Sequence, residues 1–156
     1  MSGVKHETSR LLFICTGNYY RSRFAEGLFN HLAEEHDLPW WSYSRGLNIN
    51  WIIDNTHISP FTRDALVSRD IDLRHTGERR MPLSRQDLEG ADMIIGLKRA
   101  EHYPMIKHQF PGWEKAIEYL DVHDVDLATP DEALSQIEAF VSGLIKQMAS
   151  SDVATV

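Results

Sequence analysis

The chain has 156 residues, which is enough for one domain with a substantial hydrophobic core. Hydrophobic residues make up 42% and charged residues 25% of it, a composition typical of a soluble globular protein rather than a disordered or fibrous chain. The formal net charge of −7 argues against a general nucleic-acid binder or a protein that binds anionic membranes, because both need a basic surface. A small anionic ligand is compatible with this charge, since one local cluster of hydrogen-bond donors is enough to bind phosphate.

No apolar run approaches the roughly 20 residues that cross a bilayer, so we expect no membrane segment. The first residues, MSGVKHETSR, are polar and lack the apolar core of a signal peptide, and residues 1–9 are expected to form a flexible tail. The single cysteine permits no internal disulfide, which suits a reducing compartment. These features together predict a cytoplasmic protein.

Short apolar runs alternate along the chain with longer stretches of helical spacing. Runs such as RLLFIC and ADMIIGL are typical of buried parallel strands. For the first half, in chain order, we predict a strand at 10–15, a helix at 21–35, a strand at 40–45, an irregular loop at 47–58 and a helix at 59–69. For the second half, we predict a surface loop at 72–82, a capped short helix at 83–87, a strand at 91–97, a helix at 98–107, a strand at 116–122 and a helix at 131–149.

This alternation of strands and helices indicates an α/β fold. We expect a single three-layer domain over residues 1–156, in which helices cover both faces of a four-stranded parallel sheet. In such sheets, ligands bind outside the carboxyl ends of the strands. The segment that follows the first strand is therefore the first place to look for a site.

That segment is CTGNYYRS, residues 15–22, where the first predicted strand ends and a helix begins. The first turn of a helix attracts anions through its free N–H groups and its dipole. Five residues separate Cys15 from Arg21, enough to wrap backbone amides around one tetrahedral phosphate. Gly17 and Asn18 are residue types that tolerate the left-handed backbone of such a phosphate-binding loop.

The same positive field favours the thiolate form of Cys15, which is a strong nucleophile without a general base. The planar fork of Arg21 suits two phosphoryl oxygens and the charge that develops on them in the transition state. Ser22 is placed to hydrogen-bond the sulfur. The alternative is a core cysteine beside a surface arginine, and the strand-end position with Gly17 inside the loop argues against it.

These residues resemble the low-molecular-weight protein tyrosine phosphatases, whose signature Cys-x-Gly-Asn-x-x-Arg-Ser matches residues 15–22 at every position. Further similar segments lie at 44–46, 74–97 and 120–125, so the resemblance covers nearly the whole chain. It implies a two-step hydrolysis of phosphomonoesters through a phosphocysteine on Cys15, without metal or cofactor. The implied substrate is phosphotyrosine in a protein or a small aryl phosphate.

The resemblance also implies a general acid, which protonates the leaving group and then activates water. The matching position is Asp124, although His123 and Val125 stand where the family has prolines. Asp126 is the alternative acid, and an acidic loop without a catalytic role is the other alternative.

Substrate contacts follow from the same resemblance. Tyr19 would face the leaving group, and Trp51 would lie on the variable loop after the second strand, with ordinary packing as its alternative role. Asn18 and Ser44 are expected to support the loop more than to touch substrate. The predicted phosphate-binding and substrate-binding set is Thr16, Gly17, Asn18, Tyr19, Tyr20, Ser22 and Trp51.

The chain also departs from the family pattern. Tyr20 stands where many members have a second cysteine, so a protective internal disulfide is impossible. Arg23 stands where proline is usual, and Leu97 and Lys98 stand where an acidic residue often follows the third strand. His75 aligns with the family's histidine.

Other functions are less well supported. Arsenate reduction on the same fold needs additional thiols to resolve the intermediate, and this chain has one cysteine. A non-catalytic phosphate-binding module is disfavoured because Cys15, Arg21 and a candidate acid are all present. The eight histidines, including His102 and His108 near one helix, show no metal-ligand spacing, so no metal is predicted and these two are expected at the surface or in packing. The arginines of the segment 74–85 are expected on a solvated face, and the sequence leaves the oligomeric state open.

Overall fold

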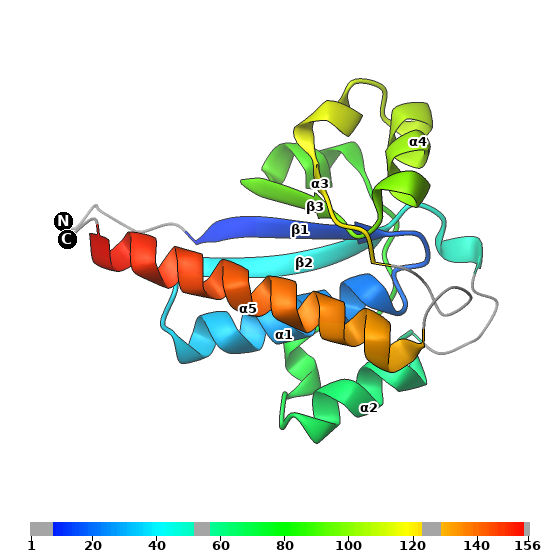
Figure 1. Ribbon diagram of the computed structural model, residues 1–156. Helices are drawn as coiled ribbons and strands as arrows, with labels where there is room; N and C mark the ends of the chain where they lie inside the picture. Colours follow the sequence, from blue (N-terminus) through cyan, green and yellow to red (C-terminus); the bar gives the residue numbers. More distant parts are fainter. Residues whose placement is uncertain (1–7, 52–56, 123–128, 155–156) are drawn as a thin grey trace.

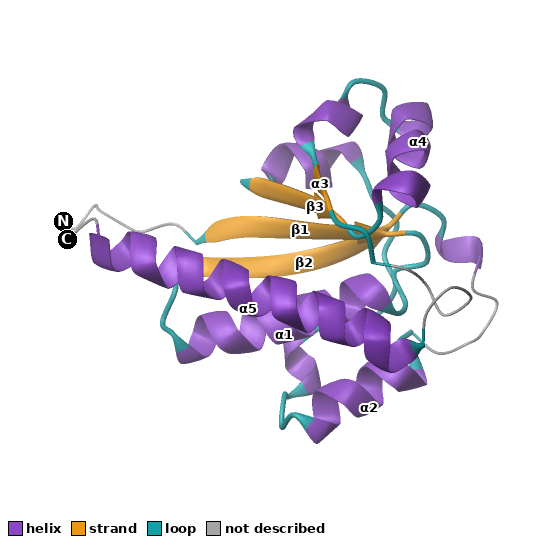
Figure 2. Cartoon of the chain, in the orientation of Figure 1, coloured by secondary structure: helices purple, strands orange, loops and turns teal. Residues whose placement is uncertain are grey.

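The computed structural model describes residues 8–51, 57–122 and 129–154. Four parallel strands form one sheet in the order β2-β1-β3-β4 (Figure 2). The strands are β1 (Ser9–Cys15), β2 (Trp40–Gly46), β3 (Met93–Gly96) and β4 (Glu118–Tyr119). The helices are α1 (Arg21–Glu35), α2 (Pro60–Ser68), α3 (Arg85–Gly90), α4 (Arg99–Gln109) and α5 (Pro130–Ala154), with short 3-10 turns η1 (Ile49–Trp51), η2 (Leu73–His75) and η3 (Trp113–Ala116).

Helices cover both faces of this sheet. Figure 1 shows α1, α2 and α5 on one side of the strands and α3 and α4 on the other. Successive residues of a strand point to opposite faces. Leu11 and Phe13 accordingly pack with α1 and α5, whereas Leu12 and Ile14 belong to the second core on the α3 and α4 side. The predicted three-layer α/β fold with a four-stranded parallel sheet is confirmed.

Local sequence signals explain where the helices begin. The Ser59 side chain caps α2 by accepting a hydrogen bond from the Phe61 amide at 3.2 Å, and Pro60 occupies the first turn, where its missing N–H costs nothing. A reciprocal capping box between Ser84 and Asp87 starts α3. Both starts agree with the sequence prediction.

Two segments differ from the prediction. The segment 72–82 is not only surface loop, since it contains η2 and buries His75 and Thr76. Asn30 of α1 donates a hydrogen bond to the His75 carbonyl at 2.8 Å, which holds η2 against the helix. The fourth strand covers Glu118–Tyr119 instead of 116–122. The η3 turn ends at Ala116 just before it, and Asp121 after it forms only an isolated bridge with Lys98.

The strand order changes direction between β1 and β3. The chain moves from β1 to β2 on one side of β1 and later returns to β3 on its other side. The connections that leave β1 and β3 therefore diverge, and open α/β sheets bind ligands where this happens. Cys15 is the last residue of β1 and Arg21 is the first of α1, so the predicted phosphate-binding loop lies at this point. No helix in the described part of the chain is long and apolar enough to span a membrane.

Candidate active site

The loop between β1 and α1 brings Cys15 and Ser22 into direct contact. The Cys15 sulfur lies 2.8 Å from the Ser22 hydroxyl, and 2% of the cysteine is exposed. Asn18 has a φ of 51°, the left-handed conformation that asparagine tolerates better than most residues. This turn reverses the chain within the loop, so that the start of α1 comes back to the end of β1.

Asn18 supports the loop through both ends of its side-chain amide. Its Nδ2 donates to the Ser22 hydroxyl at 3.0 Å and to the Ser44 hydroxyl at 2.9 Å, and its Oδ1 accepts from the Met81 amide at 2.8 Å. Because the Ser22 oxygen accepts from Asn18, its own hydrogen is available to the Cys15 sulfur. A hydroxyl donated to sulfur stabilises the thiolate. These contacts agree with the expectation that Asn18 and Ser44 fix the loop.

Gly46, the last residue of β2, lies directly against this loop. A β-carbon added there would be 2.7 Å from the Thr16 carbonyl oxygen, closer than a β-carbon comes to a backbone oxygen in folded proteins. The chain after Gly46 also supports the loop, since the Leu47 amide donates to the Cys15 carbonyl at 3.0 Å and the Asn48 amide donates to the Thr16 carbonyl at 2.8 Å. The end of β2 therefore fixes the start of the phosphate-binding loop.

A buried carboxylate lies behind Ser44. Glu26 of α1 accepts hydrogen bonds from the hydroxyls of Ser44 at 2.7 Å and Thr76 at 3.1 Å. Burial raises the pKa of the Glu26 carboxyl, although the Ser44 hydrogen bond and the charge of Arg23 act in the opposite direction. Glu26 thus connects the support of the loop to the segment that contains Thr76.

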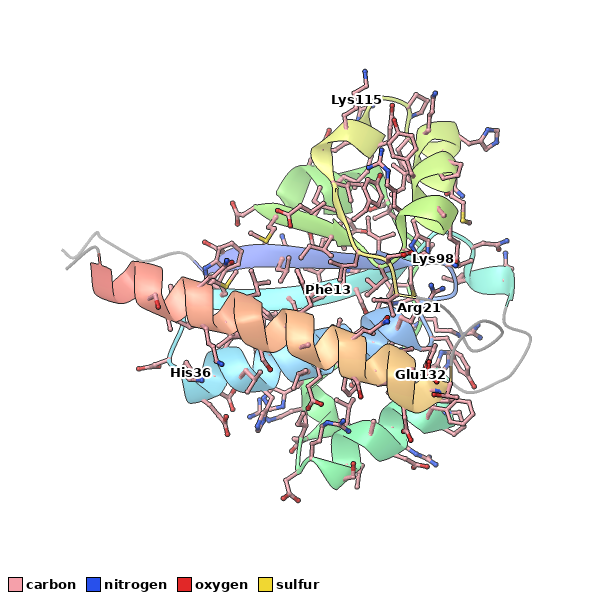
Figure 3. The ribbon with its side chains drawn as sticks, viewed as in Figure 1. Phe13, Arg21, His36, Lys98, Lys115 and Glu132 are labelled. Carbon is pink, nitrogen blue, oxygen red and sulfur yellow. The ribbon has the colours of Figure 1, made fainter. Side chains whose placement is uncertain are left out.

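Arg21 is buried and held in a fixed orientation. Its two terminal nitrogens donate to the two oxygens of Glu101 at 2.9 and 3.3 Å, and one of them also donates to the Val122 carbonyl at 3.0 Å. Arg21 begins α1 and Glu101 lies in the first turn of α4, so the contact joins the connections that follow β1 and β3. In Figure 3, Arg21 and Lys98, the residue before α4, lie at the same end of the sheet.

Glu101 gathers further donors from its neighbours. Thr16 donates its hydroxyl to Glu101, and His102 Nε2 lies 3.1 Å from the same carboxylate oxygen. The Lys98 amide donates to His102 Nδ1 at 3.0 Å, so the hydrogen of a neutral imidazole lies on Nε2, facing Glu101. Burial raises the pKa of Glu101, but the hydrogen bonds from His102, Arg21 and Thr16 and the Arg21 charge outweigh it, and the pKa lies well below its usual range.

Glu101 and His102 are two site residues that the sequence prediction missed. Leu97 and Lys98 directly follow β3, and the next acidic residue in the chain, Glu101, lies in the first turn of α4. His102 is fully buried and contacts Thr16 and Glu101, so of the two expected positions, surface or packing, it takes the packed one. An acidic residue in the first turn of the helix after β3 was the available signal.

The two loop tyrosines have different surroundings. The Tyr20 ring is packed in the core, edge-on to Phe61 at 6.3 Å between centroids, and its hydroxyl lies 3.4 Å from the Pro130 carbonyl. Only the backbone of Tyr20 is therefore placed to contact a ligand in the loop. Tyr19 is half-buried, and the Arg80 guanidinium lies 5.8 Å from its ring centroid.

Some predicted site residues cannot be placed. Asp124 and Asp126 lie outside the described residues, and so does the side chain of Trp51, whose backbone ends η1. Within residues 8–51, 57–122 and 129–154, no group of three or more His, Cys, Asp or Glu side chains is arranged to hold a metal ion.

Comparison with known proteins identifies relatives of the whole fold. Residues 10–150 match the family described as low molecular weight phosphotyrosine protein phosphatase. The protein-arginine-phosphatase of Bacillus subtilis (strain 168) is 26% identical, in an alignment that covers 88% of this chain and 95% of that protein.

Solved structures give the same picture. The low molecular weight protein tyrosine phosphatase from T. tengcongensis has a TM-score of 0.72 and 26% identity, with 92% of this chain and 99% of that chain covered. A YwlE mutant from Bacillus subtilis has a TM-score of 0.70 and 26% identity, with coverages of 92% and 97%.

Proposed function

The chain belongs to the low molecular weight phosphotyrosine protein phosphatase family and is a phosphatase with a cysteine nucleophile, and we propose the following assignment of its site residues. Cys15, the only cysteine, attacks the phosphorus of a phosphomonoester. The bond between phosphorus and the leaving-group oxygen breaks, and a phosphocysteine forms. Water then attacks the phosphocysteine and releases inorganic phosphate, with the thiolate as leaving group. The contact between the Cys15 sulfur and the Ser22 hydroxyl carries this assignment, since it stabilises the thiolate in both steps.

Arg21 binds two oxygens of the phosphoryl group in this mechanism. Glu101 and the Val122 carbonyl hold the guanidinium before substrate arrives, so no reorientation is needed as charge develops in the transition state. The amides of the loop supply the other donors, from the backbone of Thr16 to that of Ser22.

We propose Asp124 as the general acid, with Asp126 as the alternative. Arg21 donates to the carbonyl of Val122, which lies two residues before Asp124 in the chain. The residue that binds phosphate therefore also fixes the start of the segment that carries the candidate acid. Protonation of the leaving group and activation of water require an acid close to the phosphorus.

We propose phosphotyrosine in a protein, or a small aryl phosphate, as the substrate. The Tyr19 ring at the edge of the loop suits an aromatic leaving group. Phosphoarginine is the second candidate, because a Bacillus subtilis relative is named a protein-arginine-phosphatase. The Arg80 guanidinium beside Tyr19 argues against it, since a departing guanidinium would meet a like charge.

The relatives favour a phosphatase over the other functions that the sequence left open. The match to a phosphatase family over residues 10–150 supports neither arsenate reduction nor a non-catalytic role. The single thiol must also stay reduced to act, which is the basis for proposing that the protein works in the cytoplasm.

Hydrolysis of p-nitrophenyl phosphate without added metal tests the assignment. Wild type is expected to turn over, Cys15→Ser to be inactive, and Asp124→Asn to lose about 10²–10⁴-fold in kcat, the usual contribution of a general acid. Asp126→Asn is the matched control, and a larger loss in it would transfer the acid role to Asp126. Normal turnover by Cys15→Ser would refute the covalent mechanism. Parallel assays with a phosphotyrosine peptide and a phosphoarginine protein distinguish the two substrate classes.

A further inference from the structure

Arg23, the third residue of α1, is a buried cation directly after the phosphate-binding loop. Only 2% of it is exposed, and it is among the largest fully buried side chains of the described residues. Burying a guanidinium is costly unless hydrogen-bond acceptors surround it. The acceptors around Arg23 therefore indicate what this side chain holds in place.

Three segments of the chain meet at the Arg23 guanidinium. Its Nε donates to the Thr76 hydroxyl at 2.8 Å, and its two terminal nitrogens donate to the carbonyls of His57 and Gly77. The Glu26 carboxylate lies 3.8 Å from Nε. The side chain thus ties the first turn of α1 to the residues before α2 and to the residues after η2.

Burial lowers the pKa of Arg23, while the charges of Glu26 and Cys15 act to raise it. Arginine keeps its charge even when buried, so Arg23 is a permanent cation beside the loop.

One of the tied segments contacts the loop at its tyrosines. Two residues after His57, the Ser59 amide donates to the Tyr19 carbonyl at 2.8 Å. The Thr62 hydroxyl, in the first turn of α2, donates to the Tyr20 carbonyl at 2.8 Å. Displacement of residues 57–59 would therefore move the backbone that carries the Tyr19 ring.

The other tied segment contacts the loop from residues 80 and 81. Four residues after Gly77, the Met81 amide donates to the Asn18 side chain at 2.8 Å. The Arg80 guanidinium lies over the Tyr19 ring and donates to the Ile49 carbonyl at 2.9 Å. Tyr19 therefore has contacts with both segments that Arg23 joins.

We propose that Arg23 is a positioning residue for substrate selection, which fixes the segments 57–59 and 76–81 around Tyr19 and so sets how the leaving group is received. This inference rests on the proposed phosphatase function. Arg21, the phosphate-binding arginine, is held separately, by Glu101 and the Val122 carbonyl. Loss of Arg23 should therefore affect a large leaving group more than a small one.

Arg69 provides a matched control for general loss of stability. It is a half-buried arginine that ties α2 to α5 through two hydrogen bonds to Glu138, at 2.9 and 3.2 Å. Like Arg23, it joins segments that are distant in sequence. Unlike those of Arg23, its hydrogen bonds go to Glu138 and the Ala65 carbonyl, away from the two segments that flank Tyr19.

The experiment compares kcat/KM for a phosphotyrosine peptide with kcat/KM for p-nitrophenyl phosphate. Arg23→Met is expected to lower this ratio about tenfold, mainly through the KM of the peptide, because the two flanking segments lose a shared donor. Arg23→Lys keeps the charge without the planar fork, so we expect a smaller decrease in the ratio. Arg69→Met should lower the melting temperature and leave the ratio unchanged.

Hydrogen exchange adds a readout that does not depend on turnover. Faster exchange of the Ser59 and Met81 amides in an Arg23 variant than in Arg69→Met is expected, since both amides donate to the loop. An unchanged ratio in both Arg23 variants, with normal exchange, would overturn the inference. If Arg23→Met does not fold, the ratio and the amide exchange measured for Arg23→Lys decide whether the inference holds. A wild type that hydrolyses neither substrate would overturn the proposed function itself. That result is distinct from an unchanged ratio.

Discussion

Replacing Glu101 by glutamine would keep the shape of the side chain that receives the Arg21 guanidinium and remove its charge. Glu101 accepts from both terminal nitrogens of Arg21, and it also receives the Thr16 hydroxyl. A glutamine has one accepting oxygen, so at most one of the two bonds from Arg21 survives. The substitution tests whether Arg21 must be held in advance to stabilise the transition state.

The magnitude follows from the burial of this pair. A hydrogen bond to a charged group contributes about 1.5–3 kcal/mol. The Glu101 side chain is 28% exposed, so solvent screens the contact and the lower limit applies. Since about 1.4 kcal/mol corresponds to a tenfold change in rate, we expect kcat to fall about tenfold. KM should stay the same or decrease, because a neutral glutamine no longer offsets the positive charge of Arg21.

Steady-state hydrolysis of p-nitrophenyl phosphate, with inorganic phosphate as competitive inhibitor, measures both effects. Glu89→Gln is the control, because Glu89 forms an exposed pair with Arg85 on α3, a contact of the kind that contributes little. A kcat equal to that of wild type would refute the reasoning. An increase in KM at constant kcat would mean that Glu101 only keeps the binding site intact.

Four further predictions concern the stability of the fold and the oxidation of Cys15. The lowered pKa of Glu101 gives stability that is present above its ordinary value of 4.5 and lost as the pH falls below it, so the melting-temperature gap between wild type and Glu101→Gln should shrink below about pH 4.5. Gly46→Ala would place a β-carbon 2.7 Å from the Thr16 carbonyl oxygen and should destabilise by about 1–3 kcal/mol with a loss of turnover. A β-carbon at Gly143 in α5 would meet no atom within 4 Å, so Gly143→Ala should stabilise the fold by about 0.5–1 kcal/mol. Melting temperatures of the two glycine variants that shift in the same direction would contradict these two predictions. Peroxide should inactivate the enzyme through the lone Cys15, with recovery only on addition of an external thiol, and spontaneous recovery would contradict this.

The sequence was most informative where structure is local. The apolar run before Cys15 ends at the turn residues Gly17 and Asn18, and this pattern alone places a strand, a loop and a helix in order. The start of α3 is equally local, since Ser84 and Asp87 satisfy each other's backbone donors within one turn. Both predictions were confirmed because their interactions lie within a few residues.

The partners of the loop could not be predicted in the same way. Arg21 meets Glu101 from 80 positions along the chain, and the contact depends on where β3 ends and on the rotational phase of α4. His102 is a polar residue, and its polarity gave no indication that it would be fully buried. Its burial depends on the hydrogen bond that its Nδ1 accepts from the backbone at the start of the same helix. Arg23 stands where the family pattern has proline, and only its three distant acceptors explain its burial.

The electrostatics of the site reconcile an anionic substrate with a chain of net charge −7. Each buried arginine near Cys15 has a carboxylate beside it, Arg21 with Glu101 at 2.9 Å and Arg23 with Glu26 at 3.8 Å. Side-chain charge within these pairs therefore largely cancels. The attraction for phosphate must come mainly from the backbone amides of the loop and the start of α1, whose dipoles act at short range. Because screening by salt is weak at such distances, KM for p-nitrophenyl phosphate should depend only slightly on ionic strength, and a steep dependence would show that surface charges dominate binding instead.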